Sequence, residues 1–484
     1  LEYTGVVTKR EAKAQLLDGM DIERERGITI KAVAVTLPWT KDGVEYQLNL
    51  IDTPGHVDFQ YEVSRSLAAC EGAILLVDAT QGVEAQTVAN CFLALEGDLE
   101  ILPVLNKIDL PTAEPDEIAE EIETSLGLDA TEAPSVSAKT GQGVRELLDW
   151  VVEKVPPPTG DPEAPLQALV IDAVYDDYRG IVVYIRVVNG TLKARQKITL
   201  MSSKINYDVN EVGIFQPKEK KTGELHAGEV GYFWGAIKSL DDIHIGETVT
   251  HSKECGKPAP EALPGYEEPQ SMVYAGIFPT YNAELPLLRK AMVKLHLNDA
   301  SFTYEAEKSD ALGFGFRCGF LGLLHMEIVQ VRLERESNVQ IVQTAPSVKY
   351  EVVEVGKEDA PYLINSPAAL PDPNYLVETR EPIVRASVVT PPEYLGLVMK
   401  LNEERRGKYV RQEHLGARRV ILIYDLPLAE IVYDYYDVLK SGTKGYATLS
   451  YDMLGYFVAD LIKLNILVNG TPVDALSMIC HRDE

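Results

Sequence analysis

Short apolar runs alternate with amphipathic segments from about residue 47 to residue 155. The runs LNLID, GAILLVDA and ILPVLNKID have the character of strands, and the segments at 61–70 and 85–95 have helical spacing. Strands buried on both faces and separated by helices predict a parallel, doubly wound α/β sheet. Three successive prolines from Pro156 end the pattern, because proline cannot continue a helix and a proline run forms a stiff linker. We therefore assign residues 1–158 to a first domain.

The pattern changes after this linker. Residues 159–255 carry short β-rich runs such as GIVVYIRVVNG between Gly, Asn and Asp turns, which predicts a small β-barrel domain. Residues 265–350 follow the order strand, helix, strand, strand, helix, strand, which predicts a ferredoxin-like α/β sandwich. The same plan returns over residues 375–470, so we predict two ferredoxin-like α/β sandwiches in a multidomain chain. We expect residues 471–484 to be the start of a truncated C-terminal domain.

Length, cysteine content and charge narrow the class of protein. The 484 residues exceed the roughly 250 to 300 at which a single core stops growing, and no window has the ~18 continuous apolar residues that span a bilayer. Five scattered cysteines without CxxC spacing favour a reducing compartment over a disulfide framework. A net charge of -28 excludes nucleic-acid binding over the whole surface, so any RNA contact must be local.

The first chemical signal is LIDTPGHVDF at residues 50–59. An apolar strand delivers Asp52 to its carboxyl end, where open α/β sheets bind ligands, and the turn Pro54-Gly55 follows at once. A carboxylate there can hold Mg²⁺ through water, because this hard ion keeps most of its hydration. Gly55 lacks a Cβ, so its N–H can approach a phosphate closely. Taken alone, the segment also fits an ordinary strand followed by a turn.

The second signal is Asn106-Lys107-Ile108-Asp109, which follows another apolar strand. A buried Asp109 carboxylate can accept hydrogen bonds from the guanine N1–H and the exocyclic amine. Adenine has an acceptor at N1 and no amine at that edge, so it would leave Asp109 desolvated and unpaired, which a polar site rejects strongly. Asn106 can brace the neighbouring loops, and Lys107 can lie along the base. On its own, this tetrapeptide also occurs on many surfaces by chance.

The third signal, Ser137-Ala138-Lys139, can present a backbone N–H to guanine O6 while the Lys139 stem covers the base. A tripeptide carries little information by itself. Its value comes from the order DTPGH, NKID and SAK, each at the end of a predicted strand with a helix between them. This order matches the G motifs of the translational GTPases.

Over essentially the whole chain the sequence resembles the elongation factor 4 (LepA) family of translational GTPases. The most specific segment is ALGFGFRCGFLGLLHM at 311–326, where elongation factor G and its relatives have a different sequence. LNDAS at 297–301 and the Arg405-Arg-Gly run are also similar to the family. The crowded Gly and Phe residues suggest tight backbone packing at a domain contact. The stretch between the two predicted sandwiches is too short for the domain that elongation factor G inserts there. Two alternatives are a BipA-type ribosome-associated GTPase and a non-hydrolysing ribosome-binding scaffold.

The resemblance assigns further roles within the site. Residues 21–30, DIERERGITI, resemble the first switch, where Thr29 would ligate Mg²⁺ and donate its N–H to the γ-phosphate of GTP. His56 stands where the family carries the residue that orients the attacking water, and ribosomal RNA would draw it into place. The predicted GTP/GDP site comprises Thr29, Asp52, Thr53, Pro54, Gly55, His56, Asn106, Lys107, Ile108, Asp109, Ser137, Ala138 and Lys139, with His56 catalytic and with Thr29 and Asp52 on Mg²⁺.

The resemblance also implies partners and missing parts. No GxxxxGK[ST] phosphate loop occurs in the chain, so we expect it before Leu1 and regard the GTP-binding domain at 1–158 as N-terminally truncated. The alternative is a protein that does not bind a triphosphate in the usual way. The expected partners are the ribosome and, through a basic domain after Glu484, tRNA, but not DNA. The family remodels mis-translocated ribosomes by back-translocation or supports ribosome biogenesis, and residue chemistry does not choose between these roles. A basic cluster could touch ribosomal RNA or be solvated surface: Lys400, Arg405, Arg406, Lys408, Arg411, Arg418 and Arg419.

We expect a cytoplasmic monomer without an integral membrane segment. Peripheral association with the cytoplasmic face of the membrane and a chloroplast or mitochondrial location both stay open.

Overall fold

The chain folds into two compact units. One contains residues 1–83 and 87–268, and the other contains residues 84–86 and 269–484. The computed structural model describes residues 1–8, 15–176, 178–237, 243–266, 269–415 and 418–483. The division falls between the predicted β-barrel and the first predicted sandwich, while the finer domain boundaries stay predictions. Among these described residues, none of the helices is long and apolar enough to cross a membrane.

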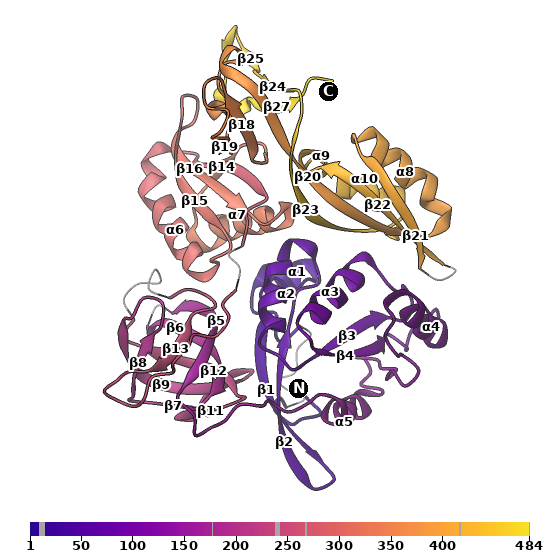
Figure 1. Ribbon diagram of the computed structural model, residues 1–484, viewed down its shortest axis with the longest axis vertical. Coiled ribbons are helices and arrows are strands. Elements are labelled where there is room, and N and C mark those ends of the chain that lie inside the picture. The colour runs from indigo at the N-terminus through magenta and orange to yellow at the C-terminus, as the bar shows by residue number, and fades with distance from the viewer. Residues whose placement is uncertain (9–14, 177, 238–242, 267–268, 416–417, 484) are drawn as a thin grey trace. The chain divides into compact units, whose positions relative to one another are not determined.

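The first unit begins with an α/β part. Its elements are α1 (Asp21–Arg26), β1 (Val33–Lys41), β2 (Val44–Asp52), η1 (Val57–Phe59), α2 (Gln60–Leu67), β3 (Gly72–Asp78), α3 (Ala85–Glu96), β4 (Glu100–Asn106), α4 (Pro115–Leu126) and α5 (Val144–Lys154) (Figure 1). Strands β3 and β4 pair in parallel, and Ser135 adds a parallel bridge to Leu105. The runs GAILLVDA and ILPVLNKID thus form the predicted parallel pair with helices between them. The LNLID run, which we expected in the same sheet, lies in a separate two-stranded sheet.

Strand β2, which carries the LNLID run, pairs with β1 in an antiparallel hairpin. The turn between them is Asp42-Gly43, and both residues have positive φ, at 51° and 79°. A two-residue turn of this kind matches the twist of the flanking strands. The hairpin therefore ends with Asp52 opposite Val33, which brings the end of the first switch region beside the DTPGH segment.

The β-rich part of the first unit closes on itself. Its strands are β5 (Gln167–Asp176), β6 (Gly180–Asn189), β7 (Thr191–Lys193), β8 (Lys197–Leu200), β9 (Asn206–Gln216), β10 (Lys218–Lys221), β11 (Glu224–His226), β12 (Val230–Gly235) and β13 (Thr248–His251). The sheet order is β10-β9-β12-β6-β5-β13-β8, and the additional pairing of β9 with β8 closes it. A continuous apolar core fills the interior, so the predicted β-barrel is observed.

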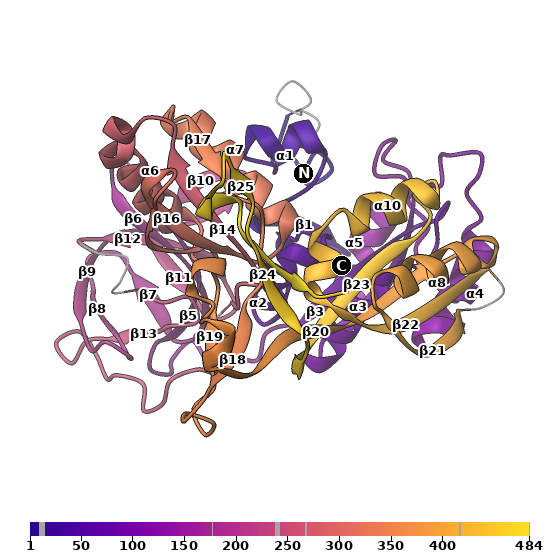
Figure 2. The same ribbon diagram turned by 90° about the horizontal axis from the view of Figure 1, so that it is seen from above.

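The second unit opens with a four-stranded antiparallel sheet. Its elements are β14 (Val273–Pro279), α6 (Leu285–Asn298), β15 (Thr303–Ser309), β16 (Gly313–Phe320), α7 (Leu323–Ser337) and β17 (Ile341–Gln343). The strand order is β15-β16-β14-β17, and α6 and α7 pack against each other and against the sheet (Figures 1 and 2). The glycine-rich segment forms β16. A Cβ at Gly315 would lie 2.5 Å from the carbonyl oxygen of Ile277, so the crowding serves close strand packing in this sheet.

The same strand order returns in the next part of the second unit. Its main elements are β20 (Leu376–Thr390), α8 (Leu395–Glu404), β21 (Lys408–Leu415), β22 (Arg419–Pro427), α9 (Leu428–Val432), α10 (Tyr435–Gly442) and β23 (Thr448–Val458). Strand β20 lies between β23 and β22, and β21 lies at the edge, as in the first sheet. Both sandwiches thus have the ferredoxin-like arrangement, and one contiguous apolar core runs through them.

Several short strands extend this second sheet and the end of the chain. They are β18 (Tyr350–Glu354), β19 (Tyr362–Ile364), β24 (Leu461–Leu464), β25 (Leu467–Val468), β26 (Thr471–Pro472) and β27 (Met478–His481). Strand β18 pairs with β20, so the second sheet begins well before residue 375. Strand β27 folds back on β24, and Asp474 accepts hydrogen bonds from the Asp310 N–H and the Ser309 hydroxyl at 2.8 and 3.0 Å.

Candidate nucleotide site

The NKID and SAK segments lie together at the end of β4. The Val136 N–H donates to the Leu105 carbonyl at 2.7 Å, which aligns the two segments. The Ala138 N–H donates to Oδ1 of Asn106 at 3.1 Å, and the hydroxyl of the fully buried Ser137 donates to Oδ1 of Asp109 at 2.8 Å. Asn106 therefore braces the loop, as predicted from its position.

The Asp109 side chain differs from the sequence-based expectation in its burial. We expected a buried carboxylate, but Asp109 is exposed. It lies beyond the end of β4, where the Leu110 N–H closes a turn on the Lys107 carbonyl at 3.1 Å, so no later strand covers it. Its Oδ1 accepts from Ser137, and no donor from the described part of the chain reaches Oδ2. A bound base would supply both the burial and the missing donor.

Lys107 adopts a left-handed backbone conformation, with φ of 65°, and its ammonium group lies 2.6 Å from Oδ2 of Asp78. Thr80 donates its N–H and hydroxyl to the other Asp78 oxygen at 2.8 and 2.7 Å. Desolvation opposes ionisation of Asp78, but the hydrogen bonds from Lys107 and Thr80 outweigh it and lower the pKa of this carboxyl. Our sequence reasoning missed Asp78, although its place at the end of the apolar run GAILLVD is the same signal that pointed to Asp52.

Thr29 and Asp52 lie near a group of acidic side chains. The Thr29 hydroxyl donates to Oδ1 of the buried Asp18 at 3.1 Å. Asp52 keeps solvent-exposed surface, yet partial desolvation of its carboxyl raises its pKa, and the negative charges of Asp18 and Glu23 add to that shift. A cation would relieve this repulsion.

Mg²⁺ fits these residues as a partly hydrated ion. No group of three or more His, Cys, Asp or Glu side chains within the described ranges is arranged to hold a metal alone. Mg²⁺ seldom uses such a cage, because it retains waters and binds through one or two carboxylates plus substrate phosphates. The Thr29 hydroxyl and the Asp52 carboxylate are donors of the right chemistry for that mode of binding.

Glu23 is a further residue that sequence reasoning did not select. Its side chain belongs to α1 and is 1% exposed. Its carboxylate accepts the N–H groups of Met20, Ile30 and Lys31 at 2.8, 3.0 and 3.2 Å. These bonds fold the segment that carries Thr29 back onto α1.

The DTPGH segment leads from β2 into η1 and α2. Pro54 is buried, Thr53 and His56 are half-buried, and Gly55 is exposed. A Cβ added to Gly55 would meet nothing within 4 Å, so the space beside this turn is open. The Nδ1 atom of His56 accepts the Asp58 N–H at 3.2 Å and caps η1, which leaves the proton of a neutral ring on Nε2.

The predicted residues thus form two groups in the described structure. Asn106, Asp109, Ser137 and Ala138 are joined by hydrogen bonds on the side of the site proposed for the base. Thr29 and Asp52 share the Asp18 and Glu23 environment on the side proposed for the phosphates. Ile108 supports the first group through its N–H to the Val136 carbonyl at 3.3 Å, and Lys139 is exposed beside it.

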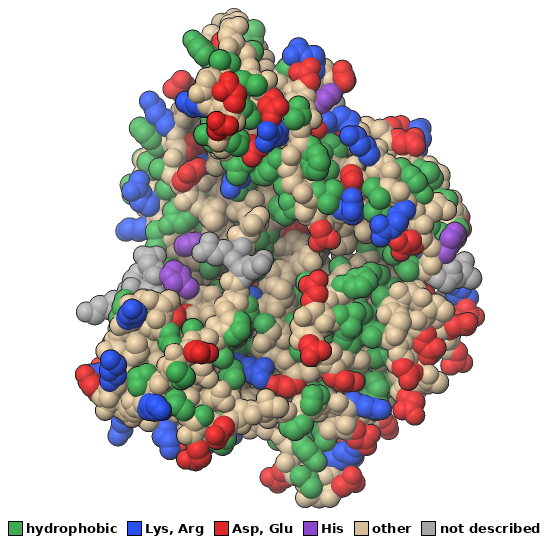
Figure 3. All heavy atoms as spheres, in the orientation of Figure 1, with side chains coloured by type: hydrophobic (Ala, Val, Ile, Leu, Met, Phe, Trp, Pro, Cys, Tyr) green, Lys and Arg blue, Asp and Glu red, His purple; other side chains and the backbone are tan. Residues whose placement is uncertain are grey.

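The basic cluster proposed for RNA is largely engaged within the protein. Arg406 contacts Glu381 and Glu430 at 2.8 and 2.9 Å, and Arg405 pairs with Asp434. Other members of the cluster are also buried or paired with acidic residues. Arg419 is buried, Arg411 pairs with Glu413, and Lys400 lies 3.6 Å from Glu404. Acidic side chains gather over α4 in Figure 3, where Glu114, Asp116, Glu117, Glu120 and Glu123 are exposed.

Family models match three parts of the chain. "Elongation factor Tu GTP binding domain" matches residues 1–157, "Elongation factor Tu domain 2" matches 180–250, and "Elongation factor G C-terminus" matches 378–467. A crystal structure of a protein from Thermus thermophilus has the same fold, with a TM-score of 0.64 and 17% identity over 94% of each chain. Together with the site, these matches define a translational GTPase, an enzyme that hydrolyses GTP.

Curated relatives specify the family. Elongation factor 4 of Bacillus subtilis (strain 168) is 55% identical over 484 residues, which are 100% of this chain and 78% of that protein. A Rhodopirellula baltica protein named elongation factor 4 1 is 57% identical over 482 residues, with 100% and 79% covered. The chain belongs to the elongation factor 4 family. This assignment excludes the alternative of a BipA-type GTPase.

Proposed function

We propose that this protein binds GTP with Mg²⁺, hydrolyses it to GDP and phosphate on the ribosome, and uses the reaction to remodel the elongating ribosome in a back-translocation-type step. The observation that carries the nucleotide assignment is the Asp109 carboxylate, held by Ser137 through one oxygen and open at the other. The ribosomal role is supported by membership of the elongation factor 4 family.

Each proposed site residue has a task that its chemistry supports. Asp109 reads the guanine edge, Asn106 joins the two base loops, and the Lys107 and Lys139 stems cover the base. Thr29 and Asp52 would hold Mg²⁺, which when bound neutralises charge on the phosphate oxygens. The open turn at Gly55 admits a phosphate close to its N–H.

His56 is the proposed catalytic residue. Phosphoryl transfer passes through a loose transition state, so the residue has to orient water and need not be a strong base. The His56 ring is held as the cap of η1 by the Asp58 N–H at 3.2 Å. Ribosomal RNA that competes for the ring would release it toward the water, which explains how turnover can depend on the ribosome.

The proposed setting follows from this role. The protein would act in the cytoplasm as a monomer, contact ribosomal RNA and proteins, and reach tRNA through the C-terminal part of the full-length protein. The basic cluster around Arg405 contributes less to RNA binding than its charge suggests, because acidic partners already neutralise several of its members. Lys408 is exposed and is the member with which to test RNA contact.

The test is GTP turnover by the full-length protein with and without 70S-type ribosomes, with ATP as the control nucleotide. We expect strong stimulation that is specific for guanine. Bound GTP without any stimulation would favour a non-hydrolysing ribosome-binding scaffold and would leave His56 without its task.

A further inference from the structure

A β-bulge in the barrel turns two consecutive side chains toward the α/β part of the first unit. The register of β5 against β6 shifts between Val170 and Asp172, so Ile171 is an extra residue in β5. Ile171 packs with Ala69, Ala34 and Ile51 of the α/β part and with Val230 of the barrel. Bulges commonly re-aim side chains in this way. The next residue, Asp172, is thereby buried at the same contact.

Asp172 makes an ion pair with Lys31, the residue that directly follows the first switch at 21–30. Oδ2 of Asp172 lies 2.8 Å from the ammonium group of Lys31, and their side chains are 11% and 21% exposed. Oδ1 of Asp172 accepts the Ala173 N–H at 2.9 Å, which orients the carboxylate. Lys31 follows Thr29 by two residues, so a barrel residue holds the segment that carries the proposed Mg²⁺ ligand.

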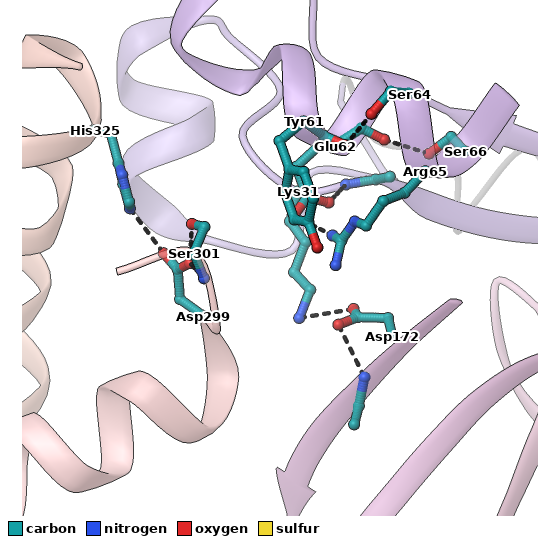
Figure 4. A network of polar contacts seen from close by, with 12 residues as sticks. Lys31, Tyr61, Glu62, Ser64, Arg65, Ser66, Asp172, Asp299, Ser301 and His325 are labelled. Atoms are coloured by element: carbon teal, nitrogen blue, oxygen red, sulfur yellow. Dashed lines mark hydrogen bonds and ion pairs between the residues drawn. The ribbon is translucent and has the colours of Figure 1, made fainter. Parts of the chain in front are cut away.

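Helix α2, which follows the DTPGH segment, reaches the same place. Helix α2 begins four residues after His56, and Oε2 of Glu62 accepts the Ala32 N–H through a long contact of 3.5 Å. Glu62 also pairs with Arg65, whose guanidinium lies 4.8 Å from the centre of the Tyr61 ring. Figure 4 shows Lys31 extended toward Asp172, with Glu62, Arg65 and Tyr61 beside it. Desolvation disfavours the charged form of Arg65, but Glu62 and then Asp172 outweigh it and raise the Arg65 pKa.

The energetics of a buried charge make this contact sensitive to the position of the switch. A buried carboxylate that loses its partner carries an uncompensated charge, which is strongly unfavourable. If residues 29–32 move away, Asp172 loses its ion pair with Lys31 and retains the Coulombic attraction of Arg65 without that ion pair. The barrel therefore favours the arrangement in which the segment is in place, and it does so through a residue outside the nucleotide site.

We propose that Asp172 is a positioning residue for GTP hydrolysis, which holds Lys31 and thereby Thr29 in the ordered state of the first switch. The inference rests on the proposed role of Thr29. It makes the barrel a part of the GTPase mechanism, because an ordered switch is required for the proposed Mg²⁺ and γ-phosphate contacts. When those contacts are lost after hydrolysis, the segment would be free to move, and the ion pair between Lys31 and Asp172 would weaken in turn.

The test uses full-length protein with the variants Asp172→Asn, Lys31→Met, Lys31→Arg and the double variant D172N/K31M. Arg186→Met is the matched control. It removes the ion pair of Arg186 with Glu71, which also joins the barrel to the α/β part but involves no residue of 21–31, of the DTPGH segment or of α2. Ribosome-stimulated turnover, GDP affinity and hydrogen exchange at the amides of residues 30–32 are measured for each protein.

We expect Asp172→Asn and Lys31→Met each to lower the stimulated kcat by roughly 5- to 150-fold, the range of typical coupling between sites. The double variant should be no slower than the slower single variant, and Lys31→Arg should retain most of the activity. GDP affinity should stay within about two-fold of the parent, because the contact of Asp172 with Lys31 is proposed to stabilise the ordered switch of the GTP-bound state. Amide exchange at 30–32 should rise in Asp172→Asn and stay unchanged in Arg186→Met.

Three turnover results would overturn the inference: an unchanged kcat in both single variants, fully additive losses in the double variant, or an equal loss in Arg186→Met. Hydrogen exchange provides a test that does not need turnover. A parent protein without ribosome-stimulated turnover would refute the proposed function, whereas unchanged exchange at 30–32 in Asp172→Asn would refute the positioning role alone.

Discussion

The hydroxyl of Ser137 donates a hydrogen bond of 2.8 Å to Oδ1 of Asp109. The two residues come from separate motifs, and this bond leaves Oδ2 of Asp109 as the oxygen open to a ligand. Ser137 also accepts the Thr140 N–H at 3.1 Å and is itself fully buried. A fixed serine thus orients an exposed carboxylate, which separates the task of positioning from the task of reading a base.

This separation predicts different effects for the two residues. Asp109→Asn replaces one acceptor oxygen by a donor, so it should shift preference from guanine toward xanthine nucleotides. Ser137→Ala keeps the carboxylate but removes its orienting bond, so it should weaken GTP about ten-fold without changing the base preference. Competition binding with GTP, xanthosine triphosphate and ATP measures both quantities. Unaltered guanine selectivity in Asp109→Asn would count against the base-reading assignment.

A second prediction concerns His56. In full-length protein, His56→Ala should leave GTP affinity nearly intact and lower ribosome-stimulated turnover by a factor of at least about 100, because the residue is proposed to act on water in the transition state. Nucleotide binding and multiple-turnover hydrolysis with saturating ribosomes separate the two effects. Phe59→Leu serves as a control for packing, since the centres of the Phe59 and His56 rings lie 6.3 Å apart. Unchanged turnover in His56→Ala would refute the role.

Glu23 gives a third prediction about the order of the first switch region. Glu23→Gln replaces one of two carboxylate oxygens that accept the N–H groups of Met20, Ile30 and Lys31. Each charge-assisted bond contributes about 1.5 to 3 kcal/mol, so local opening of residues 30 and 31 should become easier by about 1 to 3 kcal/mol. Hydrogen exchange at the amides of residues 30 and 31 measures this free energy of local opening. Glu25→Gln, an exposed position of the same helix, should have no such effect.

The sequence was most informative where the residues of a site are contiguous. The runs DTPGH and NKID each follow an apolar strand, so their position at a sheet edge could be predicted from local pattern. The two sandwiches could be predicted for a similar reason, because each repeats a short order of strands and helices. Both have the same observed strand order, although their sequences are too different to reveal a duplication.

Contacts between distant segments could not be predicted in this way. Nothing in the spacing of Lys31 and Asp172 indicates that they meet, because the contact depends on the bulge at Ile171 and on how the barrel packs. The exposure of Asp109 was also missed, since an apolar strand before it suggests burial but the turn after it removes any cover. The ion pairs within the basic cluster could not be predicted either, because acidic partners such as Glu381 and Glu430 lie about 25 residues away from Arg406 in sequence.

The two segments most typical of the family meet at Asp299 and His325, and this contact supports a prediction of pH dependence. Asp299 belongs to LNDAS, His325 follows the GFGFRCGFLG run, and Oδ2 of Asp299 lies 3.0 Å from Nε2 of His325 (Figure 4). The buried His325 accepts the Leu321 N–H on Nδ1 at 3.0 Å, so Nε2 carries the proton that Asp299 accepts. Desolvation opposes ionisation of Asp299, but His325 and Ser301 outweigh it and lower its pKa.

A carboxyl with a lower pKa in the folded state stabilises the fold above the pKa of the unfolded chain, about 3.9 for Asp, and loses this contribution as the pH falls through the folded value. Asp299→Asn should therefore destabilise the second unit by about 1 to 3 kcal/mol at pH 7, and the difference from the parent should shrink only below about pH 4. Urea unfolding of full-length protein from pH 7 to pH 3, followed by hydrogen exchange of residues in β16, measures the difference. Asp359→Asn at an exposed position is the matched control. A difference that grows as the pH falls would contradict the proposed charge state of Asp299, because a carboxyl gains stability on acidification only if folding raises its pKa.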